Sequence, residues 1–218
     1  MQSDHRHNDL NPTSIEGDPR YDQRSARPSP IVPTTLNNAL VNYFRKMSGT
    51  ATSPPRVHLS EMLWGWVGGF FGISAVAFTH FSFFEETDLI LIIGSFGASA
   101  VLIYGAIESP LAQPRNFIGG HIVSAIAGVT AYKMLHPHIS LAAAMAVALA
   151  IVGMLATRTV HPPGGATALI AVIGGEKIHA LGYLYVIMPT GAGVMIMLVV
   201  ALLVNNISHK RKYPTFWY

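Results

Sequence analysis

Long stretches without a charged side chain constrain this chain more than any other feature. No Asp, Glu, Lys or Arg occurs at 62–84, 89–107 or 178–208. An apolar run of about 18 residues or more is long enough to cross a lipid bilayer as a helix. Only 11% of the 218 residues are charged, against about 25% in a typical soluble domain. The sequence therefore predicts an all-α protein, a polytopic bundle of transmembrane helices.

Six apolar segments can be distinguished within this bundle. They cover residues 62–82, 89–107, 116–133, 139–157, 164–175 and 180–204. The fifth segment is shorter than the roughly 17 residues that a membrane span needs. A short segment flanked by Gly and Pro is tolerated in a membrane when it is buried in protein or lines water. We therefore expect the second and fifth segments either to cross the membrane or to re-enter it.

Two of the segments resemble each other. Gly-Ala-Ser-Ala at 97–100 matches Gly-Ala-Thr-Ala at 165–168. A Pro-containing motif and a further apolar segment follow each of them. This pattern predicts two three-segment repeats, which would be inverted in the membrane and would place a site where they meet.

The chain divides into three regions by composition. Residues 1–56 are rich in Pro, Ser, Asp, Asn and Arg, and we expect them to be disordered on the cytoplasmic side. Within them, residues 35–47 carry apolar side chains at helical spacing. This pattern fits an interfacial helix on the membrane surface or an ordinary packed helix. Residues 57–208 form the predicted transmembrane domain, and 209–218 form a short basic and aromatic tail.

The orientation follows from the flanking charges. Arg45, Lys46 and Arg56 precede the first span, and the basic stretch 209–212 follows the last. Positive residues stay on the cytoplasmic side, so both termini should be cytoplasmic and the number of crossings even. The acidic loop 84–88 then lies outside. Because no organelle or secretory signal is evident, we expect a bacterial inner membrane.

Two stretches, 109–121 and 157–168, combine Pro, Gly, a cation and small hydroxyl side chains beside an apolar segment. Pro162 and Pro163 interrupt a continuous helix and suit the first turn of a new one. The amides of 164–167 would then be free donors at a helix N-terminus, which is a ready anion site. This interpretation predicts a site for a small monoanion.

Arg115, after Pro114, and Arg158 would add positive charge to this site. Both arginines could equally be topology anchors at the membrane surface. The predicted substrate-binding residues are Ser99, Gln113, Arg115, Asn116, Arg158, His161, Pro162, Pro163, Gly164, Gly165, Ala166 and Thr167.

His161 and His121 are the candidates for carrying a proton with the anion, because histidine titrates near physiological pH. His161 could instead cap the following helix, and His121 could hold two helices together. His136 and His138 lie two residues apart, but no further metal ligand is apparent beside them. We therefore predict no metal, no cofactor and no catalytic residue.

The motif Arg-Thr-Val-His-Pro-Pro-Gly-Gly-Ala-Thr-Ala-Leu at 158–169 resembles the HPP family of integral membrane proteins. Further matching motifs are Phe-Gly-Ala-Ser-Ala-Val at 96–101, Ser-Pro-Leu-Ala-Gln-Pro-Arg-Asn at 109–116, Gly-Gly-His at 119–121 and Tyr-Pro-Thr-Phe-Trp at 213–217. The resemblance covers about residues 60–218. It implies a small multi-helix membrane protein, usually described with four spans. Some members of that family are linked to nitrite transport.

The function that these observations favour is transport of a small inorganic monoanion, with nitrite the preferred candidate, by a transporter or channel. Two alternatives are a scaffold or sensor subunit without transport, and a membrane-embedded metalloenzyme that uses His161 and His121. The few acidic residues near the spans lie at segment edges, which disfavours catalysis. The expected partners are the anion, the lipid bilayer and a second copy of the chain, because glycines in the first span suit a homodimer. We expect no nucleic-acid partner.

Overall fold

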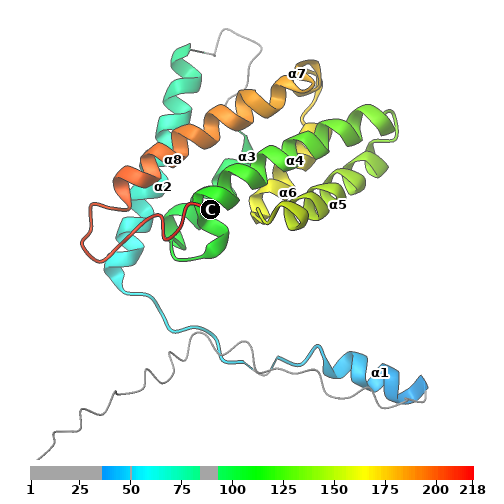
Figure 1. Ribbon diagram of the computed structural model, residues 1–218, viewed down its shortest axis with the longest axis horizontal. Helices are drawn as coiled ribbons and strands as arrows, with labels where there is room; N and C mark the ends of the chain where they lie inside the picture. Colours follow the sequence, from blue (N-terminus) through cyan, green and yellow to red (C-terminus); the bar gives the residue numbers. More distant parts are fainter. Residues whose placement is uncertain (1–35, 50, 84–92) are drawn as a thin grey trace, which may run out of the picture. The chain divides into compact units, whose positions relative to one another are not determined.

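The computed structural model describes residues 36–49, 51–83 and 93–218 (Figure 1). The chain divides into two units, Met1–Pro54 and Pro55–Tyr218. The described residues form helices and no strand. The predicted disorder of the N-terminal residues and the predicted external loop 84–88 fall largely or wholly outside the described residues.

The first unit contains one described helix, α1 (Leu36–Arg45). Tyr43 and Phe44 on this helix are both exposed and contact each other edge to face. The helix lies within the predicted range of 35–47. That it rests on a membrane surface stays a prediction.

The described residues of the second unit form four helices that are long and apolar enough to cross a membrane. These are α2 (Leu59–Phe83), α4 (Pro114–Leu135), α5 (Ile139–Thr157) and the segment Val186–Val204, with 25, 22, 19 and 19 residues. The last segment consists of a π-helix, η3 (Val186–Gly191), which continues into α8 (Ala192–Val204). These helices make the chain a multi-pass integral membrane protein.

The second and fifth predicted segments form the two shorter apolar helices. The second comprises α3 (Gly94–Ala100), which continues into the π-helix η1 (Val101–Gly105), and the fifth is α6 (Pro162–Ile173). At about 1.5 Å per residue, neither is long enough to span the hydrocarbon core of about 30 Å. The sixth predicted segment begins too early, because its first two residues belong to α7 (Glu176–Leu181), a separate helix before the spanning part.

Small residues set the packing of α6. Gly120 and Gly128 of α4 face α6 so closely that an added Cβ would lie 2.5 Å from the Cβ of His161 and 2.8 Å from the Cα of Ala168. On α5, the small side chains of Ala142 and Ala146 are fully buried. The helices therefore approach each other at backbone distance, as membrane helices with small residues do.

The glycines of the first span serve a contact within the chain. An added Cβ at Gly68 or Gly72 would collide with the ring of Tyr104 in η1, whereas Gly69 has no neighbour within 4 Å. These glycines were the reason to expect a homodimer, and two of them are already covered by Tyr104. The homodimer stays a prediction.

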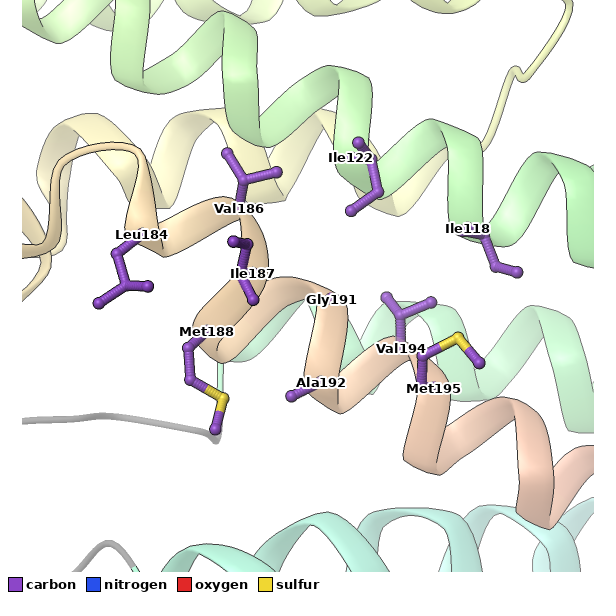
Figure 2. Close-up of a pocket in the computed structure, with 10 residues that line it drawn as sticks. All are labelled: Ile118, Ile122, Leu184, Val186, Ile187, Met188, Gly191, Ala192, Val194 and Met195. Atoms are coloured by element: carbon purple, nitrogen blue, oxygen red, sulfur yellow. The ribbon is translucent and has the colours of Figure 1, made fainter.

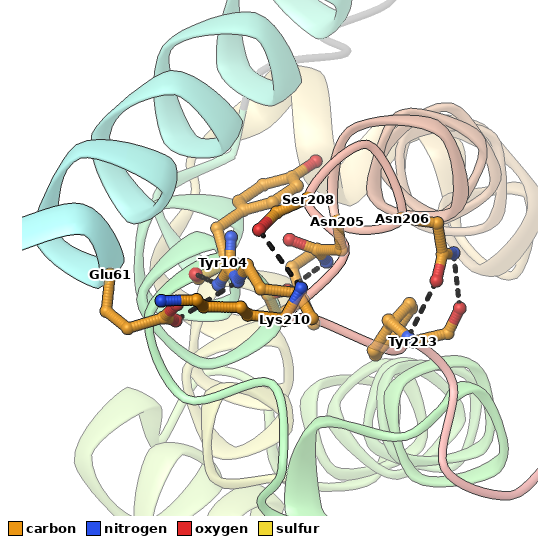
Figure 3. A network of polar contacts seen from close by, with 9 residues as sticks. Glu61, Tyr104, Asn205, Asn206, Ser208, Lys210 and Tyr213 are labelled. Atoms are coloured by element: carbon orange, nitrogen blue, oxygen red, sulfur yellow. Dashed lines mark hydrogen bonds and ion pairs between the residues drawn. The ribbon is translucent and has the colours of Figure 1, made fainter.

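The C-terminal tail packs back onto the bundle (Figure 3). The side chain of Asn206 binds both main-chain groups of Tyr213. Its Nδ2 donates to Tyr213 O at 2.6 Å, and its Oδ1 accepts from the N–H of Tyr213 at 3.0 Å. The hydroxyl of Tyr213 donates to Ala112 O at 2.8 Å. Arg211 is only 6% exposed and pairs with Glu61 of α2. This basic residue is therefore part of the packed structure rather than a free positive flank.

Candidate functional site

The start of α6 lies where the sequence predicts it, but its first three residues offer no free donor. Pro162 and Pro163 occupy the first two helical positions and have no N–H to offer. The N–H of Gly164 donates to His161 O at 2.8 Å. The prolines thus remove the donors that would otherwise be unsatisfied at this end of the helix. The amide of Gly164, one of the four amides predicted to be free for an anion, is therefore already used.

The two arginines lie near the C-terminal end of α5. The Nη2 atom of Arg115 donates to Thr157 O at 3.1 Å. Arg158 follows α5 in a left-handed backbone conformation, with φ of 56°, and its side chain is exposed. Cations at a helix C-terminus interact favourably with its partial negative charge. This placement suits the alternative in which both arginines are anchors.

A buried polar cluster links α3, α4 and α6, and we name it the histidine cluster. It consists of Ser95, Ser99, His121, His161 and Thr167, each 0% exposed. Ser99 Oγ lies 2.7 Å from His121 Nε2 and 2.9 Å from His161 Nε2. His121 Nδ1 lies 2.7 Å from Thr167 Oγ1, which in turn lies 2.9 Å from Ser95 Oγ. A chain of hydrogen bonds therefore connects three helices.

The tautomer of His161 follows from its partners. Its Nδ1 lies 2.8 Å from Leu111 O, and a carbonyl can only accept, so Nδ1 carries the hydrogen. In the neutral ring, Nε2 is then an acceptor, and the Ser99 hydroxyl donates to it. Since this uses the single hydroxyl hydrogen of Ser99, His121 must donate from Nε2 to Ser99 Oγ.

The protonation state of His121 then depends on which atom the Thr167 hydroxyl donates to. When Thr167 donates to His121 Nδ1, both histidines are neutral. The geometry also directs the Thr167 hydroxyl toward Ser95 Oγ at 2.9 Å. When it donates there, His121 must donate from both nitrogens and carries one extra proton. The neutral cluster and the protonated cluster therefore differ in the direction of the Thr167 hydroxyl as well as in one proton on His121.

Aromatic side chains enclose the histidine cluster. The ring of Phe117 lies edge-on to both imidazoles, with centroids 5.4 Å from His121 and 5.3 Å from His161. Phe96 contacts His121 in the same way. Tyr185, the ionisable neighbour beside the cluster, donates from its hydroxyl to Thr167 O at 3.0 Å. Among the described residues, no group of three or more His, Cys, Asp or Glu could hold a metal ion.

The structure brings four of the predicted site residues together: Ser99, His121, His161 and Thr167. Gln113 and Asn116 support them from nearby. Gln113 Nε2 donates to Ile107 O and Ser109 O at 2.8 and 2.9 Å, and Asn116 Nδ2 donates to Val160 O at 2.8 Å.

Three other predicted residues, Pro162, Gly165 and Ala166, lie at the start of α6 outside these contacts. Sequence reasoning missed Ser95 and Tyr185. Ser95 lies one helical turn before Ser99, so the spacing of the two serines was a usable signal. Nothing in the sequence marks Tyr185 in this way.

The fold and this site define a class, a multi-pass helical membrane protein with a polar cluster buried among its spans. Residues 54–214 match the HPP transmembrane region, and the chain belongs to the HPP transmembrane family. This confirms the family that the motif at 158–169 indicates.

Two transmembrane proteins of Dictyostelium discoideum are similar to the chain. They are 48% identical over 181 residues and 42% identical over 184 residues. Each alignment covers 82% of this chain but 58% and 64% of the respective relative, so the chain spans about three fifths of their length. No solved structure matches the chain.

Proposed function

We propose that this HPP-family protein is a transporter that couples movement of a small monoanion to a proton held by the histidine cluster. The observation that carries the proposal is the position of Ser99 Oγ, within 2.9 Å of one nitrogen on each of two fully buried histidines. Ionisable residues inside a membrane domain are rare and mark proton or substrate pathways.

The two hydrogen-bonding states of the cluster support a role for the proton. In both states each imidazole nitrogen keeps a hydrogen-bond partner, and the states differ by one proton on His121 and by the direction of the Thr167 hydroxyl. An imidazole that is bonded at both nitrogens in both states gains and loses a proton without leaving either nitrogen unsatisfied. Such a group is suited to carry protons between two sides of a membrane.

The arrangement of the two short helices also supports transport. The two short helices begin at matching positions. α3 begins at Gly94, three residues before the first residue of the motif at 97–100, and α6 begins at Pro162, three residues before the first residue of the motif at 165–168. Ser99 and Thr167 occupy the same position in the two motifs and bind opposite nitrogens of His121. Many transporters consist of inverted repeats whose short or broken helices form the site at the repeat interface. We include the inverted repeat and the re-entrant second and fifth segments in the proposal.

The charge of the protonated cluster supports an anionic substrate. A protonated His121 is a net positive charge, and among the residues that the structure describes no carboxylate contacts the cluster. In a low-dielectric environment, a neighbouring anion stabilises such a charge strongly. Nitrite is the first anion to test because the family resemblance names it. The proposed location is a bacterial inner membrane with both termini cytoplasmic, and the proposed activity is not enzymatic.

Proteoliposomes test this proposal. Purified protein should take up nitrite faster when the outside is more acidic than the inside. The variant His121→Gln should lose this dependence, while its thermal unfolding in detergent reports whether it folds. Uptake no faster than in empty vesicles, with folded protein, would rule out nitrite transport.

A scaffold or sensor subunit is the second candidate. The observation in its favour is that each member of the histidine cluster is completely buried and hydrogen-bonded, as in a purely structural network. In that case His121→Gln would lower stability and complex assembly, and no anion or proton flux would be measured with the wild-type protein.

A further inference from the structure

A second polar region, which shares no residue with the histidine cluster, lies at the start of α2. A cavity of about 540 Å³ opens there between α2, the turn after η1 and the C-terminal tail. We name it the charged cavity. Charged side chains in its lining are Glu61, Glu108, Lys210 and Arg211.

The guanidinium of Arg211 lines this cavity, and not all of its N–H groups have a hydrogen-bond partner among the described residues. Its Nη2 donates to Tyr104 O at 2.6 Å, and its Nε lies 3.3 Å from Glu61 Oε2 as an ion pair. Its Nη1 is buried and has no hydrogen-bond partner in the described part of the chain. Burial lowers the pKa of Arg211 and the Glu61 carboxylate raises it, but arginine remains charged in proteins. A buried N–H without an acceptor is unfavourable, so a ligand oxygen at this place would be stabilising.

Two further side chains of opposite charge face the same cavity. Glu108 and Lys210 are both exposed, and neither side chain has an ion-pair partner within the residues that the structure describes. Figure 3 shows the Lys210 side chain extending toward Glu61 at the start of α2. The cavity thus offers a carboxylate and an ammonium in addition to the Arg211–Glu61 pair. A ligand with a single charge would match one of them and be repelled by the other.

The position of the cavity indicates where such a ligand comes from. Glu61 and Met62 lie in the first turn of a 25-residue apolar helix, where a span meets the lipid headgroups. Trp66, one turn further along α2, is 66% exposed, and tryptophan is enriched at this depth of a membrane. The apolar side chains of Val57, Met62 and Ile107 line the cavity beside the charged ones. A molecule with a charged head and an apolar body matches this lining.

We infer that the charged cavity binds the headgroup of a zwitterionic phospholipid with a primary ammonium group, as in phosphatidylethanolamine. The phosphate accepts hydrogen bonds from Arg211 and Lys210, and the ammonium group donates to Glu108. This site shares no residue with the histidine cluster and does not depend on the proposed transport function.

Native mass spectrometry of the purified full-length chain in detergent tests the inference. The probes are phosphatidylethanolamine, phosphatidylglycerol, which has the phosphate but no ammonium, and soluble phosphoethanolamine. Phosphatidylethanolamine should be retained most strongly. Lys210→Gln and Glu108→Gln should each weaken its binding by about tenfold, since one charge-assisted hydrogen bond is worth about that much.

Matched controls exist on the same molecule. Lys212→Gln and Glu176→Gln remove equal charges from exposed positions outside the cavity and should leave lipid retention unchanged. Equal retention of the two phospholipids would overturn recognition of the ammonium group. Equal effects of cavity and control variants would overturn the site. Binding of soluble phosphoethanolamine as tightly as the lipid would overturn the lipid as its source.

Discussion

At the scale of single residues, two buried serines differ in what their hydroxyl groups do. Ser99 contacts two histidines, whereas Ser124 Oγ on α4 is buried without a hydrogen-bond partner among the described residues. Removing a hydroxyl that satisfies buried partners leaves those partners unpaired, and removing an unpaired hydroxyl does not. Substitutions at the two positions therefore distinguish the stability contributed by hydrogen bonds in the cluster from the effect of removing a buried serine hydroxyl that has no partner.

We expect Ser99→Ala to lower the free energy of unfolding by about 1–3 kcal/mol, because one nitrogen on each histidine loses its partner. Ser124→Ala should leave stability unchanged or raise it slightly. Thermal unfolding in detergent measures both, and nitrite uptake under a pH gradient should be lost with Ser99→Ala alone. Equal loss of stability in the two variants would contradict the hydrogen-bond assignment.

At the scale of helices, the start of α6 is held by its fit against α4. An added Cβ at Gly164 would lie 2.6 Å from Ser124 Oγ and 2.9 Å from Gly120 O, whereas at Gly165 it would meet nothing within 4 Å. Neighbouring glycines of the same motif thus have different surroundings. The motif at 158–169 therefore contains residues that pack α6 against α4 as well as the predicted substrate-binding residues.

Gly164→Ala should destabilise the protein by about 1–3 kcal/mol, because the methyl group forces α4 and α6 apart. Gly165→Ala should be neutral or stabilising by up to about 1 kcal/mol, because alanine favours helix over glycine. Denaturation of both variants in the same detergent provides the comparison. A more stable Gly164→Ala protein would show that the two helices are not in contact at this point.

The C-terminal tail connects to the histidine cluster through the turn before α4. Tyr213 binds Ala112 O, and the preceding carbonyl, Leu111 O, binds His161 Nδ1. The N–H of Thr215 also donates to Gln113 Oε1 at 2.8 Å. Burial raises the pKa of Tyr213, so its hydroxyl stays a neutral donor at physiological pH. The tail therefore helps to position the carbonyl that fixes the tautomer of His161.

We expect Tyr213→Phe to lower stability by about 1 kcal/mol, because Ala112 O loses its donor. It should also shift the pH dependence of uptake, because the turn that carries Leu111 O is held less firmly. Tyr218→Phe is the control, since Tyr218 is 94% exposed. If the two variants have the same pH profile as the wild type, the tail does not influence the histidine cluster.

At the scale of the whole molecule, the four long and two shorter apolar helices among the described residues predict an even number of crossings. The chain contains no cysteine, so single cysteines can be introduced without a background signal. Thr52→Cys and Tyr218→Cys, both at exposed positions, should react with a membrane-impermeant maleimide from the same side of oriented vesicles. Reaction from opposite sides would mean an odd number of crossings and would exclude the proposed topology.

The sequence by itself determined the membrane class, most of the helices and the start of α6. Charge-free apolar runs are readable locally because bilayer thickness sets the length of a span. Proline positions are equally local, because the ring fixes φ and removes a donor. The sequence also predicted that the second and fifth segments differ from the others. It placed Ser99, His121, His161 and Thr167 among the candidate site residues.

Only the tertiary structure decided what those residues contact. Ser99 and His161 are 62 positions apart in the chain, and no local pattern predicts a distance of 2.9 Å between their side chains. The same holds for the burial of Arg211, which the sequence places in a basic flank and the fold places against Glu61. Local chemistry determines which helices form in a membrane, whereas side-chain pairing depends on how those helices pack.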